Sequence, residues 1–234
     1  MITKINTLPK FQNDDYCSVK IKSLYRAYGT NYDFCQFYVQ KESDDITAII
    51  LKFYASATVY VIDKTNIDEL YSFLTRLSVF EITSNIKLNI GIIELEFSQL
   101  KLDITSNNTY SKSLVLEDYK RAYSLFSNDK SGNICIGDFD EWYVDISHRV
   151  RHNAAYLISD ENVAVVCLTD GENLNLNGIV VKHKKQKLGT KTIDILKNFS
   201  SEKSIFVACD IGVSHFYLKN GFKNIGNIYI YGEK

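Results

Sequence analysis

Runs of apolar residues divide the first half of the chain into segments typical of strands. Aromatic and β-branched side chains, which pack well on a pleated surface, are concentrated in residues 33–40, 46–53, 57–62 and 80–102. The polar sequence at residues 106–109 is typical of a linker. We therefore expect an N-terminal α+β domain over residues 1–108 and a second domain over residues 109–234.

Capping residues mark the beginnings of two helices. Asn66 is followed three residues later by Glu69, which is the spacing of a capping box, and apolar residues then recur at helical intervals up to Leu77. Asp138 precedes a second helical pattern that carries Trp142, which we expect in the core.

The second half alternates helices and strands in a definite order. The helix after Asp138 follows a helical pattern at residues 116–126. The later segments are strands at 153–159, 163–169 and 175–181, a helix at about 190–198, a strand at 204–209, a short helix at 212–219 and an end strand within 223–231. This order predicts a mixed, mostly antiparallel, twisted sheet flanked by helices.

Composition places the chain among globular proteins. The chain has 234 residues, of which 45% are hydrophobic and 24% charged, and a net charge of −1 argues against wholesale nucleic-acid binding. Five scattered cysteines favour buried, reduced thiols, and no His or Cys pair has the spacing of metal ligands or singles out a nucleophilic thiol. No apolar run approaches the ~20 residues that span a bilayer, and no leader is recognisable, so we expect a cytoplasmic protein without membrane contact.

The segment from Gly178 to Phe222 carries the strongest chemical signal. A strand at Ile179, Val180 and Val181 leads into a lysine-rich loop that opens into a helix near Thr190. The free N–H groups and the dipole of a helix N-terminus both favour an anion, and here lysines surround them. A pyrophosphate is the natural ligand, although a lysine run is often only a solvated surface.

Two motifs in this segment resemble the coenzyme-binding core of the GNAT N-acetyltransferase superfamily. Gln186-x-x-Gly189-x-Lys191 matches the first two positions of the family's loop, (Gln/Arg)-x-x-Gly-x-(Gly/Ala), and departs from it at Lys191. A register shifted by two residues places Lys187 at the first glycine and Gly189 at the second, and both registers stay open. Phe216-Tyr217-x-x-x-Gly221-Phe222 matches the family's later segment without a departure.

The resemblance covers about residues 110–234 and implies an acyl-CoA N-acyltransferase fold and activity. The implied enzyme moves an acetyl group from acetyl-CoA directly to an amine of a small molecule or peptide, with Tyr217 assisting the departing thiolate. The implied coenzyme-binding residues are Ile179, Val180, Val181, Gln186, Lys187, Leu188, Gly189, Thr190, Lys191, Asp210 and Ser214. The family's first strand is either short, at residues 111–115, or missing, and the N-terminal half is a candidate degenerate copy of the same fold.

The general base and the functional class leave alternatives open. Glu141, Asp145, His148 and His152 lie on or just after the Asp138 helix and are candidates for the base, against the alternative that they form a charged helix end. His183 is a further candidate. The alternative functions are a non-catalytic acyl-CoA-binding regulatory protein and an interaction module that uses the lysine loop as a basic patch.

Overall fold

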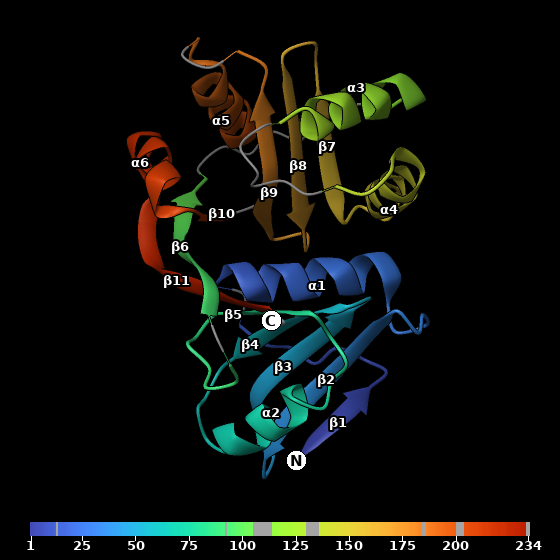
Figure 1. Ribbon diagram of the computed structural model, residues 1–234, viewed down its shortest axis with the longest axis vertical. Helices are drawn as coiled ribbons and strands as arrows, with labels where there is room; N and C mark the ends of the chain where they lie inside the picture. Colours follow the sequence, from blue (N-terminus) through green and yellow to red (C-terminus); the bar gives the residue numbers. More distant parts are fainter. Residues whose placement is uncertain are drawn as a thin grey trace.

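The computed structural model describes residues 1–12, 14–91, 93–104, 114–129, 136–183, 186–199 and 204–232 (Figure 1). The elements of the N-terminal half are β1 (Ile2–Ile5), α1 (Tyr16–Tyr28), β2 (Cys35–Glu42), β3 (Asp45–Phe53), β4 (Ser56–Val61), α2 (Ile67–Leu74), β5 (Glu81–Ser84) and β6 (Ile93–Asp103). The C-terminal elements are α3 (Leu116–Ser127), α4 (Phe139–Arg151), β7 (Ala155–Ser159), β8 (Val163–Thr169), β9 (Asn173–Val181), α5 (Leu188–Phe199), β10 (Ser204–Cys209), α6 (Ile211–Lys219) and β11 (Lys223–Gly232).

All of these strands form one mixed sheet in the order β1-β2-β3-β4-β5-β11-β6-β10-β9-β8-β7. The pairs β4–β5 and β9–β10 are parallel, and the other neighbours are antiparallel. The predicted mixed, mostly antiparallel sheet flanked by helices is therefore confirmed. The sheet twists strongly, so that its two ends face α1 from opposite sides (Figure 1).

The two ends of the sheet repeat one pattern. Strands β2, β3 and β4 form an antiparallel meander, after which α2 leads to β5 parallel to β4. Strands β7, β8 and β9, helix α5 and strand β10 follow the same course. The strand that comes next in each half pairs with the other half of the chain. Strand β6, which comes after β5, pairs with β10, and strand β11, which comes after β10, pairs with β5. The two halves of the chain thus interlock through β6 and β11.

Local sequence explains the central elements. Strand β8 reads VAVVCLT and is buried along its whole length, as expected for a strand covered on both faces. The predicted Asp138 cap of α4 is confirmed, since its side chain accepts a hydrogen bond from the Glu141 N–H. Trp142 packs against Phe126 and Tyr123 between α3 and α4, where it is partly buried against the core cluster of these helices. Four cysteines are free and buried, and Cys135 lies outside the described residues.

The predicted capping box at Asn66 is wrong. Asn66 lies in the left-handed region at φ 58° and makes no side-chain cap, although α2 begins at the next residue. The Glu69 carboxylate instead accepts hydrogen bonds from the Ile2 N–H and from the Gln40 amide, and it pairs with the N-terminal ammonium. The requirements of β1 and β2 override the local capping pattern.

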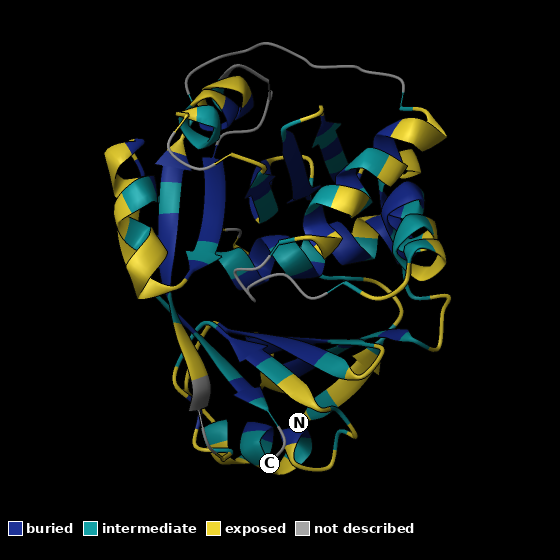
Figure 2. Cartoon of the chain, turned by 45° about the horizontal axis from the view of Figure 1, so that its top comes forward, coloured by how far each residue is buried: buried dark blue, intermediate teal, exposed yellow. Residues whose placement is uncertain are grey.

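Helix α1 and strand β1 were not predicted, although α1 holds the two ends of the sheet together. Asp15 and Ser18 form a capping box, and Cys17, Ile21 and Leu24 are buried at helical spacing. Helix α1 packs on strands of both halves, and its buried residues form one core with β2 and β3 (Figure 2). The strand-like segment 80–102 proves to be two strands, β5 and β6. Residues 111–113 of the candidate first strand lie outside the described residues, and among the described strands β7 is the edge strand at the C-terminal half's end of the sheet.

Candidate functional site

A gap opens between the parallel strands β9 and β10. Their pairing covers only the first residues of each strand and ends at Phe206 and Asn175, although β10 continues to Cys209 and β9 to Val181. Beyond this point the two strands diverge, so the facing main-chain groups of β9 have no ladder partner on β10. This divergence makes room for a ligand between strands of one sheet.

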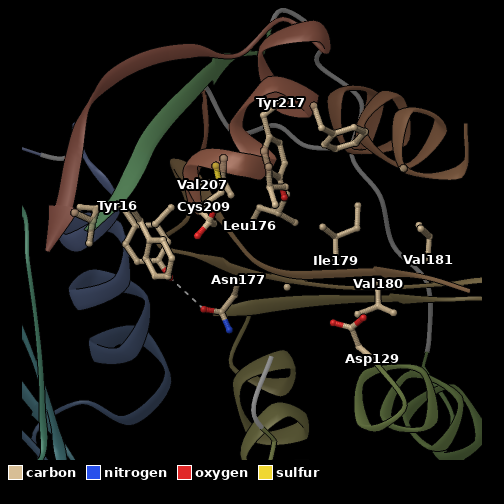
Figure 3. A pocket seen from close by; sticks show the side chains of 18 of the residues that line it. Tyr16, Asp129, Leu176, Asn177, Ile179, Val180, Val181, Val207, Cys209 and Tyr217 are labelled. Atoms are coloured by element: carbon tan, nitrogen blue, oxygen red, sulfur yellow. Dashed lines mark hydrogen bonds between the residues drawn. The ribbon is translucent and has the colours of Figure 1, made fainter. Parts of the chain in front are cut away.

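A cavity of about 730 Å³ occupies this gap (Figure 3). Its walls come from β9, β10, α6 and the beginning of α5, together with α1 and β5 from the N-terminal half. The sequence-predicted residues Ile179, Val180, Val181, Lys187, Leu188, Gly189, Thr190, Asp210 and Tyr217 all line it. Gln186, Lys191 and Ser214 do not, so the structure brings together most of the predicted site.

The N-terminus of α5 opens at one end of the cavity, which we call the coenzyme end because the sequence resemblance implies a coenzyme there. Lys187 has a left-handed backbone at φ 56°, directly before the helix begins at Leu188. The first helical bond runs from the Lys191 N–H to the Lys187 carbonyl. Within the described residues, the N–H groups of Leu188, Gly189 and Thr190 have no hydrogen-bond acceptor, as expected for a first helical turn. These groups and the helix dipole favour a bound anion.

Lys187 and Gly189 have the features expected at the two glycine positions of the loop motif in the register shifted by two residues. Glycine is the usual residue at positive φ, and here Lys187 has that conformation. Gly189 is restricted for a different reason: a Cβ at this position would lie 2.9 Å from the Phe216 ring. Lys191 lies a turn further into α5 and is exposed, so its side chain does not obstruct the loop. Lys184 and Lys185 lie outside the described residues.

Tyr217 lies in the middle of the cavity wall, on α6 (Figure 3). Its side chain is 5% exposed, and its hydroxyl has no hydrogen-bond partner among the described residues. Burial, with a smaller contribution from the nearby thiols of Cys209 and Cys167, raises the pKa of Tyr217 above its usual range. Burial therefore keeps the phenol protonated, so its hydroxyl is available as a hydrogen-bond donor to an anion formed in the cavity.

A β-bulge on β9 lies beside the gap. Val166 of β8 faces Gly178, whereas Cys167 faces Leu176, so Asn177 is the additional residue and has no partner on β8. The Asn177 side chain accepts a long hydrogen bond of 3.5 Å from the Tyr16 hydroxyl (Figure 3). The residues of the bulge, Leu176, Asn177 and Gly178, all line the cavity, so the bulge forms part of its wall.

Asp210 and Ser214 have local roles in α6. The Asp210 carboxylate caps the helix by accepting a hydrogen bond from the Gly212 N–H at 2.7 Å, and it still reaches the cavity. The Ser214 hydroxyl donates to the Ile211 carbonyl within the helix.

At the level of sequence, no protein-family model matches the chain, and neither does any curated protein. Solved structures do match. A GCN5-related N-acetyltransferase from Sphaerobacter thermophilus aligns with a TM-score of 0.54 at 10% identity, over 88% of this chain and 82% of that chain. The chain has the GNAT fold.

Two further solved structures match about nine-tenths of the chain. A tandem GNAT protein from the clavulanic acid biosynthesis pathway aligns with a TM-score of 0.51 at 8% identity, over 90% of this chain and 87% of that chain. Saccharomyces cerevisiae N-myristoyltransferase with bound myristoyl-CoA aligns with a TM-score of 0.51 at 10% identity, over 92% of this chain and 73% of that chain. These alignments include the N-terminal half and establish the fold alone.

The charged residues of α4 lie away from the cavity of this GNAT fold. Asp145 pairs with Arg149 at 2.6 Å and accepts a hydrogen bond from the Tyr28 hydroxyl of α1. His148 stacks on the Tyr28 ring, and its Nε2 lies 2.9 Å from the Ala27 carbonyl. These residues join α4 to α1, and neither they nor Glu141 and His152 line the cavity. The prediction of a general base among them therefore has no support, whereas His183 does reach the cavity.

Sequence reasoning missed the cavity residues of the N-terminal half. Tyr16 and Lys20 come from α1, and Glu81 and Thr83 come from β5. Spacing of four residues places Tyr16 and Lys20 on one face of α1, a signal that recognition of this helix would have supplied. Nothing local in the sequence brings Glu81 to the same cavity. Among the described residues, no helix has the length and apolar character needed to cross a membrane.

Proposed function

We propose that the protein is an acyl-CoA-dependent N-acyltransferase that moves an acetyl group to an amine by direct transfer. The observation that carries this proposal is the cavity between β9 and β10, which joins an anion-binding helix N-terminus to the buried hydroxyl of Tyr217. A thioester substrate with a pyrophosphate at one end and an acyl group at the other has this arrangement of charge and reactivity.

The coenzyme end suits the diphosphate of CoA. The N–H groups of Leu188, Gly189 and Thr190 would hold it, aided by the Lys187 ammonium. The open edge of β9 from Ile179 to Val181 would pair with the amide groups of the pantetheine arm, in the manner of an added strand. Asp210 completes this wall. Gln186, Lys191 and Ser214 have no contact with the cavity and are not part of the proposed site.

The reacting end is proposed to work by positioning and proton transfer. The amine nitrogen bonds to the thioester carbon, the carbon–sulfur bond breaks, and Tyr217 donates its proton to the departing thiolate. A main-chain N–H at the Asn177 bulge, which lies in the cavity wall, would polarise the thioester carbonyl. Starting from an ammonium, the acceptor loses two protons: one replaces that of Tyr217 and the other is released to solvent. The balance is one amide, one CoA thiol and one proton.

The N-terminal half is proposed to be a copy of the same fold without a coenzyme site. Asn66 and Lys187 both have a left-handed backbone, each directly before the helix that links two parallel strands. The first turn of α2 carries Asp68 and Glu69, however, and the Glu69 carboxylate binds the chain's own N-terminus. These carboxylates oppose a phosphate at that position.

Calorimetric titration with acetyl-CoA, followed by a thiol-release assay across a panel of amines, tests the proposal. We expect saturable binding and amine-dependent release of CoA. Binding without release for any amine supports the alternative of a non-catalytic acyl-CoA-binding protein. An absence of binding at millimolar acetyl-CoA overturns the proposed function while leaving the fold intact.

A further inference from the structure

The end of the cavity opposite α5, which we call the acceptor end, is built largely by the N-terminal half. Tyr16 and Lys20 extend into it from α1, and Glu81 and Thr83 extend into it from β5. Its remaining wall is apolar and consists of Phe97 from β6 together with Ile228 and Ile230 from β11. An apolar wall with a few convergent polar groups is typical of a small-molecule site.

Lys20 has an unusual environment for a lysine. Its side chain is partly buried, and among the described residues its ammonium has neither an ion pair nor a hydrogen bond. Burial lowers the pKa of Lys20, and Glu81 is the carboxylate that acts against this shift. A partly buried cation without a partner costs free energy unless an anion binds beside it. By contrast, the buried guanidinium of Arg149 is paired with Asp145.

The position of Lys20 is fixed by the fold. Asp15 and Ser18 cap the first turn of α1, and the Asn175 amide of β9 donates to the Tyr16 carbonyl at 2.7 Å. Helix α1 is therefore tied directly to the strand that forms the gap. The backbone at Lys20 is thus held beside the cavity, which places the unpaired Lys20 side chain in the cavity wall.

Glu81 supplies the opposite charge at the same end. Its main chain pairs on both sides, with Ser56 and with Gly232, whereas its exposed side chain has no partner among the described residues. Lys20 and Glu81 are the two charged side chains that line the acceptor end within the described part of the chain. A ligand that carries both an ammonium and a carboxylate complements this pair.

We infer that the acceptor is a free amino acid with an apolar side chain, whose carboxylate binds Lys20 and whose ammonium binds Glu81. The apolar side chain would lie against Phe97, Ile228 and Ile230. This inference rests on the proposed function, because it names the acceptor for the same site. Lys20 and Glu81 select and orient the amine, while the chemistry stays with Tyr217.

Three related amines test the inference in the thiol-release assay: phenylalanine, phenylalaninamide and phenethylamine. They share the aromatic side chain, and only phenylalanine carries a carboxylate. Loss of one hydrogen bond to a charged group corresponds to about 10- to 100-fold in affinity. We therefore expect Lys20→Met to lower kcat/KM for phenylalanine by about that factor and to leave the other two amines almost unchanged. Lys20→Arg should restore most of the loss.

Two controls separate a local effect from a structural one. Lys120→Met removes an exposed lysine of α3 away from the cavity and should change neither kcat/KM nor the preference among amines. The affinity of Lys20→Met for acetyl-CoA should equal that of the wild type, which shows that the cavity is intact. Equal losses for all three amines, or a wild type without preference for phenylalanine, overturn the inference.

Direct binding distinguishes failure of this inference from failure of the proposed function. Calorimetry with phenylalanine and no acyl-CoA should give saturable binding to the wild type that Lys20→Met weakens. That result keeps the amino-acid site even when no thiol is released. Thiol release from simple amines, with no binding of phenylalanine, keeps the acyltransferase and rejects the amino-acid acceptor.

Discussion

Tyr217→Phe and Tyr231→Phe should separate catalysis from stability, because the two tyrosines are equally buried and differ in their hydrogen bonds. Tyr217 is 5% exposed and Tyr231 is 4% exposed. The Tyr217 hydroxyl has no partner among the described residues, whereas the Tyr231 hydroxyl accepts from the Leu88 N–H at 2.5 Å and donates to the Leu88 carbonyl at 3.1 Å. Each substitution removes a single oxygen atom and keeps the ring.

The expected magnitudes follow from these partners. Tyr217→Phe breaks no hydrogen bond, so the free energy of unfolding should change by less than ~0.5 kcal/mol. Loss of a positioned proton donor should lower kcat by about 10²- to 10⁴-fold, or roughly 3 to 5 kcal/mol of transition-state stabilisation. Tyr231→Phe leaves the buried Leu88 N–H without an acceptor and should lower the free energy of unfolding by about 1–3 kcal/mol, with kcat unchanged.

Urea unfolding gives the stability of each variant, and thiol release at saturating acetyl-CoA gives kcat. Since the Tyr217 ring remains, the KM for acetyl-CoA should stay close to that of the wild type. A Tyr217→Phe enzyme with undiminished kcat would refute the proposed proton donor. A loss of stability as large as that of Tyr231→Phe would show instead that the Tyr217 hydroxyl has a structural partner.

Three further predictions concern other parts of the chain. Burial raises the pKa of Asp15 to about 6, against a lowering by the Ser18 hydrogen bonds, so the native state binds its proton more tightly than the unfolded state with its pKa of 3.8. The contribution of this proton to the free energy of unfolding is fully present below pH 3.8 and is lost as pH rises through 6, by about 3 kcal/mol in all. Asp15→Asn, which is an equally good cap, should flatten the dependence of the free energy of unfolding on pH, measured by unfolding titrations at several pH values. Gly189→Ala should weaken acetyl-CoA binding measured by calorimetry, because the added Cβ would lie 2.9 Å from the Phe216 ring. Phe216→Leu in the same chain should restore binding, and a failure to restore it would show that the clash with Phe216 is not the cause. Because Glu69 occupies the corresponding position of the N-terminal half, the same titration should give one acetyl-CoA per chain, and two would contradict that reasoning.

Local patterns in the sequence determined much of the C-terminal half. The strands β7, β8, β9 and β10 lie within two residues of their predicted bounds, because their apolar runs are bounded by turn residues. Asp138 caps α4 as predicted, since a cap depends only on groups three residues apart. The motif around Tyr217 singled out this residue as a candidate, and the structure places it in the cavity wall, whereas its catalytic role stays a prediction.

Tertiary structure decided the remainder. Glu69 lost its predicted capping role because β1 and Gln40, distant in sequence, supply competing hydrogen-bond donors. The acceptor end combines Lys20 with Glu81 and with residues of β11, and these meet only because β11 crosses over to pair with β5. Sequence periodicity reports which face of an element is apolar, but not which distant element covers it. The residues proposed for the coenzyme end lie mostly in one contiguous stretch and could be named from the sequence, whereas those proposed for the acceptor end come from distant segments and required the fold.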